Sequence, residues 1–437
     1  MSHEALIGIY CFIGMLFIVL AGFPIFISLI LPAVIGLWII GGPTFVLEQT
    51  TTATYNISSS YTFAVVPMFV LMGIFAGESG IAEDAYNAAS KWVMKLRGGL
   101  LMATIAANAI FGACSGIPTG GTVVFTKIAM PQLIKQGYDK SLSLACIASA
   151  AVLVTLIPPS MPIIITCILV DLSIGRALIA GIIPGILLVV LMSLTVWIAG
   201  HLKPELMPAS ANTNVTWKER VFSLKLLWPI ILIFLIMMGG MYLGIFPPTV
   251  GGAIGAFSTL VYALALRRMN TKSILHAFWE SVIINAQLFI IIIGGMLFAR
   301  LIALSGLAQG FNDFLLSSQF PPLGIMAIII VFYLLLGCVM DLTPIVIITL
   351  PIVFPILTGH LGFDPYATVI ILLFLGALGS ITPPIGMSCF VVASAANTNP
   401  VDVYRGIVPF FLVQLAMVIL LIFVPGIASW LPHLFVH

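Results

Sequence analysis

The sequence has very little charge. Only 7% of its 437 residues are Asp, Glu, Lys or Arg, whereas 61% are hydrophobic, and the net charge is +2. So small a polar fraction cannot cover the surface of a water-soluble protein of this size, and there is no basic tract to bind nucleic acid. The composition therefore predicts an integral membrane protein with lipid around it.

The sequence also lacks the motifs of enzymes and ATP-driven pumps. It contains no P-loop, no GxSxG and no HExxH, so we expect neither an enzyme nor an organic cofactor. Its six cysteines are widely spaced, form no CxxC pair and lie in apolar segments. We interpret them as small packing residues and not as redox or metal groups. Energy for any transport must come from an ion gradient or from a partner.

Long apolar runs take up most of the chain. Crossing a hydrocarbon core of roughly 30 Å takes about 20 apolar residues per helix, and residues 182–198, 226–243 and 410–424 are examples of such runs. We predict an all-α integral membrane fold with about 10–12 transmembrane helices. The first run begins near Ala5 without a basic region or a small-residue cleavage site, so we expect a retained helix and not a signal peptide.

The two halves of the chain repeat one another weakly at a nearly fixed spacing. We therefore predict a first repeat at residues 1–200, a polar linker loop at 201–225 and a second repeat at 226–437. Five landmarks recur in the same order and at almost the same offset: Ser79-Gly80 as Ser305-Gly306, Gly112 as Gly337, Gly137 as Gly362, Pro158-Pro159 as Pro383-Pro384, and Gly181 as Gly406.

Basic residues indicate that the second repeat is inverted. Short cytoplasmic loops collect Lys and Arg, and the first repeat has Lys91, Lys95 and Arg97 after its third expected crossing. The matching stretch of the second repeat, residues 307–324, contains no Lys or Arg. An odd number of crossings per repeat also forces opposite topology. We expect the linker to be cytoplasmic and the N-terminus to be periplasmic.

One segment in each half is too interrupted to be a straight helix. Gly112 and Pro118 lie within residues 100–131, and Asp341 lies at the centre of residues 323–355. Open backbone at membrane depth is tolerated only where it is buried in protein or lines a cavity. We therefore predict two re-entrant helical hairpins over these two ranges.

A second break follows each predicted hairpin, at residues 155–160 and 379–384, where Pro-Pro pairs stand. Half-helix ends present free carbonyls and amides, so each hairpin tip with its neighbouring break can form an oxygen-rich site for Na⁺ or an amide site for an anion. Two repeats predict two such sites. The alternative is that the breaks only bend ordinary membrane helices.

Two charges, Arg300 and Asp341, stand inside apolar segments, where a charge costs roughly 2.5–3.5 kcal/mol. Arg300 either clamps a carboxylate or sulfonate with its planar fork, or pairs with Asp341, or extends its charge to the membrane surface. For Asp341 we rank capping of the hairpin and pairing with a base ahead of Na⁺ coordination. Both residues are expected to be needed for transport.

The ordered motifs resemble a known family, the large membrane subunit (DctM-like or SiaM-like) of tripartite ATP-independent periplasmic, or TRAP, transporters. The resemblance extends over essentially the whole chain, and it is the ordered set that is specific. The motifs are Phe111-Gly112-Ala113-Cys114-Ser115-Gly116, Met130-Pro131, Ile157-Pro158-Pro159-Ser160, Gly337-Cys338-Val339-Met340-Asp341, Leu350-Pro351-Ile352 and Thr382-Pro383-Pro384-Ile385-Gly386.

The resemblance implies an elevator-type importer of organic anions in the bacterial inner membrane, coupled to two or more Na⁺ ions. It also implies a periplasmic substrate-binding protein (DctP-like) and a small membrane subunit (DctQ-like) as a separate chain. By position, the first Na⁺ site would use Gly112, Ser115, Thr155 and Pro158, and the second would use Gly337, Asp341, Gly379 and Thr382. Substrate contacts would come from Arg300, Asp341, Ser115 and Pro159.

Two other functions remain open from the sequence. A stand-alone ion-coupled anion transporter with a related architecture would need no binding protein. A channel or scaffold subunit would not need interrupted hairpins in both halves, which makes it the weaker alternative.

Overall fold

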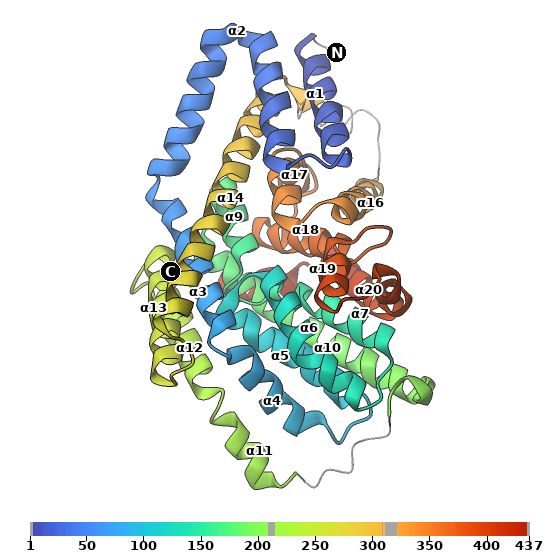
Figure 1. The fold of residues 1–437 in the computed structure, drawn as a ribbon. Coiled ribbons are helices and arrows are strands. Elements are labelled where there is room, and N and C mark those ends of the chain that lie inside the picture. The colour runs from blue at the N-terminus through green and yellow to red at the C-terminus, as the bar shows by residue number, and fades with distance from the viewer. Residues whose placement is uncertain (1–2, 209–214, 308, 311–320, 435–437) are drawn as a thin grey trace.

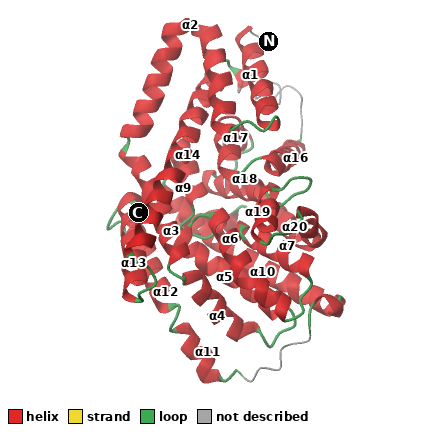
Figure 2. Ribbon diagram, in the orientation of Figure 1, coloured by secondary structure: helices red, strands yellow, loops and turns green. Residues whose placement is uncertain are grey.

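The computed structural model describes residues 3–208, 215–307, 309–310 and 321–434, and the regular structure in these ranges is entirely helical (Figures 1 and 2). The first half contains α1 (His3–Leu20), α2 (Ile25–Ser59), η1 (Tyr61–Ala64), α3 (Val65–Glu78), α4 (Ile81–Val93), α5 (Gly99–Ser115), α6 (Pro118–Lys135), α7 (Lys140–Ala150), α8 (Val152–Leu156), α9 (Met161–Leu169) and α10 (Ile174–Leu202).

The linker and the second half are also helical. They contain η2 (Pro204–Leu206), α11 (Trp217–Leu224), α12 (Trp228–Tyr242), α13 (Pro248–Ala265), α14 (Thr271–Leu304), α16 (Pro322–Val339), α17 (Leu342–Pro355), the π-helical turn η3 (Ile356–His360), α18 (Pro365–Gly379), α19 (Met387–Ala395), α20 (Pro400–Phe423) and α21 (Gly426–Leu434).

Many of these helices are long and apolar enough to cross a membrane. Within the described ranges there are ten such segments by length and composition, and an eleventh if Lys140–Leu156 and Met161–Leu169, bent by 44°, form one crossing. Exposed apolar side chains such as Phe17 and Leu243 (72% and 78% exposed) suit contact with lipid. The predicted all-α membrane protein is confirmed.

Helix α2 consists of two arms joined at Gly42, whose φ of 79° lies in the left-handed region. Pro43 starts the second arm, since proline cannot donate to the preceding helix but fits the first turn of a new one. The two arms meet at the end of the molecule that holds the N-terminus, and α14 packs along them (Figure 1).

The helices recur in the same order in the two halves at the expected spacing. Helix α7 begins at Lys140 and its counterpart α18 begins at Pro365. Their caps also match, because Asp139 accepts a hydrogen bond from the Leu142 amide at 2.8 Å and Asp364 accepts one from the Ala367 amide at 2.9 Å. Both helices lie in the interior, where 142–150 and 367–379 are buried throughout.

The linker is partly helical. The predicted loop at 201–225 is wrong for Trp217–Leu224, which form α11. Its start is a capping box, since the Glu219 amide donates to Thr216 Oγ1 at 3.3 Å and the Thr216 amide donates to Glu219 Oε2 at 2.8 Å. Helix α11 and the N-terminus lie at opposite ends of the molecule (Figure 1).

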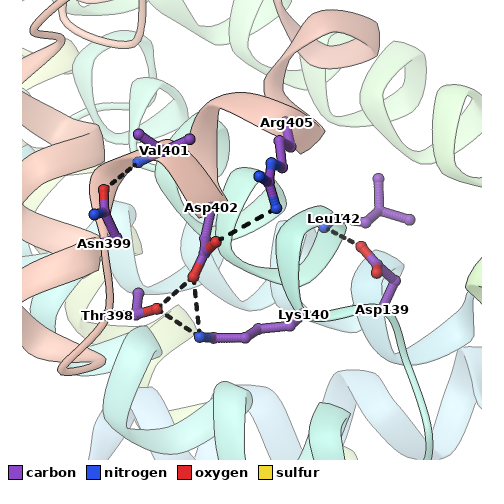
Figure 3. A network of polar contacts seen from close by, with 8 residues as sticks. All are labelled: Asp139, Lys140, Leu142, Thr398, Asn399, Val401, Asp402 and Arg405. Carbon is purple, nitrogen blue, oxygen red and sulfur yellow. Dashed lines mark hydrogen bonds and ion pairs between the residues drawn. The ribbon is translucent and has the colours of Figure 1, made fainter.

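Among the described residues, ionic contacts join the two halves at two places. Asp84 of α4 is buried and pairs with Arg268, which follows α13, at 2.5 Å and 3.1 Å. On the surface, Lys140 at the start of α7 contacts Asp402 at the start of α20 at 3.1 Å, and Thr398 donates to the same carboxylate (Figure 3).

Candidate functional site

The first hairpin turns at Gly116, directly after α5. Gly116 has a φ of 64°, which favours glycine, and Pro118 starts α6. The Gly116 carbonyl accepts a hydrogen bond from the Met161 amide at 3.1 Å, and a Cβ at Gly116 would lie 2.6 Å from the Pro159 carbonyl oxygen. We call residues 115–118 the first tip. It lies directly against residues 157–160, the first break.

Helix α5 and the first tip lie against α8 and the first break, so the four residues predicted for the first cation site stand on segments that contact one another. A Cβ at Gly112 would lie 3.2 Å from the Val154 Cα, which places α5 against the residue before Thr155. Pro158 is buried, and the Ser160 hydroxyl donates to the Thr155 carbonyl at 2.6 Å. The predicted break is present as the non-helical stretch between α8 and α9. Pro159 of this stretch contacts the hairpin at Gly116, and Val154 of α8 contacts it at Gly112.

Two hydroxyl oxygens at this joint make no hydrogen bond. The Ser115 Oγ and the Thr155 Oγ1 are both buried and without a partner among the described residues. An unpaired buried hydroxyl costs roughly 1–3 kcal/mol, so such atoms usually mark a bound water or ion. Hydroxyl and carbonyl oxygens are the ligands that hard cations prefer.

The second hairpin turns at Met340 and Asp341, between α16 and α17, and we call residues 339–342 the second tip. The Cys338 carbonyl accepts a hydrogen bond from the Gly386 amide at 3.0 Å, and Cys338 Sγ contacts the Pro383 carbonyl oxygen at 3.3 Å. The end of α16, directly before the second tip, therefore lies against residues 380–386, the second break. The two amide donors, Met161 and Gly386, occupy equivalent positions in the two repeats.

Close approach of two glycines holds the second hairpin in place. A Cβ at Gly337 would lie 2.4 Å from the Gly379 Cα, and a Cβ at Gly379 would lie 2.6 Å from the Gly337 Cα. Any side chain at either position would collide with backbone, which explains the glycine at both. Asp341 follows Gly337 and Thr382 follows Gly379 within one helical turn of this crossing in sequence.

The oxygens of the second site have a different environment. The Thr382 hydroxyl donates to the Leu378 carbonyl at 2.8 Å, and Thr382 is partly exposed. Asp341 occupies the N-cap position of α17, but its side chain makes no capping hydrogen bond, and no ion pair within 4.0 Å joins it to a described base. The predicted pairing of Asp341 with Arg300 is therefore absent from the described structure.

Arg300 lies in a cavity of about 780 Å³ near the end of α14. Its guanidinium side chain is exposed and makes no described ion pair. Asp341, Ser115 and Pro159 do not line this cavity, so the predicted substrate residues are divided between it and the two tips. Its wall comes from four separate segments and includes Ser60, Thr62, Asp171, Ser173, Ile347 and Pro351.

Two polar residues near these sites were not predicted. Asp171 lies in the Arg300 cavity with a φ of 53°, and Asn397, at the corresponding place in the second half, has a φ of 50°. Asn108 is buried in α5, and its Oδ1 has no partner among the described residues. The signal was available, because Asn108 is a polar residue inside an apolar run that leads to the first tip.

Comparisons with known proteins agree on one family. The family model of the DctM component of the tripartite ATP-independent periplasmic transporter matches residues 12–427. The C4-dicarboxylate TRAP transporter large permease protein DctM of Pseudomonas aeruginosa is 28% identical, over 87% of this chain and 88% of that protein. The ectoine/5-hydroxyectoine TRAP transporter large permease protein UehC of Ruegeria pomeroyi is 30% identical, over 97% and 98%.

A solved structure has the same fold. The YdaH transporter of Alcanivorax borkumensis superposes with a TM-score of 0.63, covering 99% of this chain and 100% of that one at 15% identity.

Proposed function

Since this chain belongs to the DctM family, the large permease component of TRAP transporters, we propose that it imports a small organic anion by sodium symport. As a transporter permease it is not an enzyme. The family accounts for the transport and for the tripartite assembly; the coupling ion, the substrate class and the movement are our proposal.

The observation that carries the proposal is the hydrogen bond between hairpin and broken helix, which occurs once in each half. The Met161 amide binds the Gly116 carbonyl, and the Gly386 amide binds the Cys338 carbonyl. Broken helices whose ends meet a hairpin tip are the usual setting for coupling ions in secondary transporters, because their free carbonyls replace water around the ion. The repetition supports two ion sites.

The first Na⁺ site is formed by the oxygens of Gly112, Ser115, Thr155 and Pro158. The free hydroxyls of Ser115 and Thr155 support it, since a cation would satisfy both. The second Na⁺ site is formed by Gly337, Asp341, Gly379 and Thr382. Its carboxylate, from Asp341, is available because it forms no ion pair with a described base.

The two hairpins are re-entrant and belong to inverted repeats that move as an elevator. Helices α5 and α6 lie toward the α11 end of the molecule, and α16 and α17 lie toward the N-terminal end (Figure 1). Hairpins entering from opposite faces fit opposite topology of the repeats. In this arrangement the linker is cytoplasmic and the N-terminus periplasmic, in the inner membrane of a bacterium.

Arg300 recognises the anionic group of the substrate. Its guanidinium has no described ionic partner and lines a cavity large enough for a small organic acid. Relatives are named for C4-dicarboxylate, isethionate and 2,3-diketo-L-gulonate, each of which carries a carboxylate or a sulfonate. A small carboxylate or sulfonate is therefore the proposed substrate class.

The proposed partners are a periplasmic substrate-binding protein and a small membrane subunit. A relative in Oleidesulfovibrio alaskensis is named as a permease protein DctMQ, of which this chain covers 64%. That fusion supports a small subunit that acts beside this chain as a DctQ-like protein.

Uptake into proteoliposomes tests the proposal. Vesicles would contain this chain with its small subunit, and the binding protein and a labelled dicarboxylate, isethionate or diketogulonate would be added outside. We expect saturable uptake that needs both the binding protein and an inward Na⁺ gradient. Uptake without the binding protein would favour a stand-alone carrier, uptake unchanged when K⁺ replaces Na⁺ would refute sodium coupling, and conduction without saturation would refute a carrier.

A further inference from the structure

A separate pocket of about 530 Å³ opens near the linker, between α4 and the end of α6. Tyr138, Pro208 and Leu226 also line it, so it touches the linker and the residue that follows the linker. No residue of the two tips, and not Arg300, lines it. The proposed transport function leaves this pocket without a role.

The polar wall of the pocket is basic. Lys91 and Lys135 line it together with the neutral side chains of Asn87, Gln132 and Gln136. Its described lining includes no carboxylate, and neither lysine forms an ion pair within 4.0 Å in the described structure. Two ammonium groups beside amide donors favour an anion with several acceptor oxygens, such as a phosphate.

Glu219 is the carboxylate whose charge interacts with Lys91, but it is engaged elsewhere. Its Oε2 accepts hydrogen bonds from the amide and the hydroxyl of Thr216, at 2.8 Å and 3.0 Å. The capping box of α11 therefore occupies this carboxylate and leaves the ammonium of Lys91 available to a ligand.

An apolar groove lies beside the basic pocket. Leu226 lines both the pocket and a second hollow of about 460 Å³ between α12 and α13. The walls of this groove are mainly aliphatic and aromatic and include Leu232, Ile236, Phe257 and Val261. A basic pocket of this size beside an apolar groove matches an amphiphile better than a small free anion.

The surrounding side chains place this region at a membrane surface. Trp92, Trp217 and Trp228 are exposed by 38%, 70% and 59%, and the Trp92 and Trp217 rings contact one another at 6.2 Å. Tryptophan gathers where lipid headgroups meet the hydrocarbon core, and Lys and Arg near that level attract anionic lipids.

We propose that the pocket between α4 and α6 binds the phosphate headgroup of an anionic phospholipid, with an acyl chain in the α12–α13 groove. Lys91 and Lys135 hold the phosphate, and Gln132 and Gln136 donate hydrogen bonds to its oxygens. The bound lipid connects α4, which leads into the first hairpin, with α6, which leaves it. This binding is independent of the transported solute.

The test is thermal unfolding of the full chain in neutral detergent with added phosphatidylglycerol, phosphatidylcholine or inorganic phosphate. The pocket variant is Lys91→Gln with Lys135→Gln. The matched control is Lys95→Gln with Lys127→Gln, two lysines near the same helices that do not line the pocket. Both variants remove two charges, so a general loss of basicity affects them alike.

We expect phosphatidylglycerol to raise the Tm of the wild-type chain and of the control at the same lipid concentration. The pocket variant should need about thirtyfold more lipid, because each lysine near an anionic headgroup contributes on the order of a fivefold gain. Equal lipid dependence of the two variants would overturn the proposal. So would a full Tm shift with inorganic phosphate, which would indicate a free-anion site, or with phosphatidylcholine, which would indicate binding of lipid in general.

Discussion

The two hairpins contact their broken helices through similar hydrogen bonds but in different surroundings. Pro158 and Pro159 of the first break are buried, as is Thr155 just before it, whereas Pro383 and Pro384 of the second break are exposed. Each break nevertheless binds its own hairpin through an amide-to-carbonyl hydrogen bond. The repeat therefore determines the path of the backbone, and the side chains packed around it determine how open each site is.

The hydroxyl groups differ in the same way. Ser115 and Thr155 each keep an unpartnered buried oxygen, whereas the Thr382 hydroxyl is already bonded to the Leu378 carbonyl. In the proposed sites, the two hydroxyls of the first are therefore preformed and buried, whereas the Thr382 oxygen of the second is partly exposed and keeps its lone pairs for a cation or for water.

The largest expected effect distinguishes the close helix contact at Gly337 from the looser one at Gly112. Gly337→Ala should lower the free energy of unfolding by about 3 kcal/mol, since its Cβ would collide with the Gly379 backbone. Gly112→Ala should cost below about 1 kcal/mol, because its contact with Val154 is 3.2 Å and can relax. Thermal unfolding measures both, with Gly359→Ala, which would touch nothing within 4 Å, as the control. Equal losses of stability in Gly337→Ala and Gly112→Ala would show that the two helix contacts are equally tight.

A smaller effect is expected at Arg300, and it tests whether anion recognition is independent of the two tips. Arg300→Ala should lower kcat/KM for uptake about fiftyfold, since a hydrogen-bonded charge contributes roughly 1.5–3 kcal/mol. Arg300→Lys should recover only part of it, because an ammonium lacks the planar fork. The Na⁺ dependence of thermal stability should stay as in the wild type. A changed Na⁺ dependence would mean that Arg300 acts through an ion site.

A further prediction compares the hydroxyls directly. Ser115→Ala should raise the Na⁺ concentration for half-maximal uptake about tenfold, since it removes a ligand worth about 1.4 kcal/mol. Thr382→Val should raise it less, because Thr382 is partly exposed and water can take the place of its oxygen. Uptake measured against Na⁺ concentration at constant ionic strength gives both values. A larger effect at Thr382 would reverse the assignment of the preformed site.

The smallest expected effect lies outside the tips. Lys140→Gln breaks the contact with Asp402 shown in Figure 3, and the Lys140 side chain is 51% exposed. Exposed pairs contribute roughly 0–1 kcal/mol, so we expect a loss in stability below about 1 kcal/mol that shrinks at high salt. A loss above about 2 kcal/mol, more than exposed pairs contribute, would show that this surface contact stabilises the joint between α7 and α20.

The sequence was sufficient to predict the helix breaks but not their surroundings. Gly116 and Pro118 mark the first tip, and the spacing of the repeat then places the second. The capping box of α11 was also readable from Thr216 and Glu219, although the stretch was interpreted as a loop. These features are local, and local chemistry determines them.

The packing of segments that are far apart in the chain could not be predicted from the sequence. The cavity of Arg300 combines η1, the start of α10 and α17, segments that are far apart in the chain. The pairing of Asp84 with Arg268 and the absence of a described Arg300–Asp341 pair depend equally on how the helices pack. A single sequence places these charges along the chain but cannot choose their partners.

The most direct test of the account is Na⁺-dependent thermal stability of the solubilised chain, with choline replacing Na⁺ at equal ionic strength. The account predicts that Na⁺ raises the Tm of the wild type, and that the combined change Ser115→Ala with Thr155→Val removes most of this gain. The same Na⁺-induced gain in both proteins would contradict an ion site at the first tip.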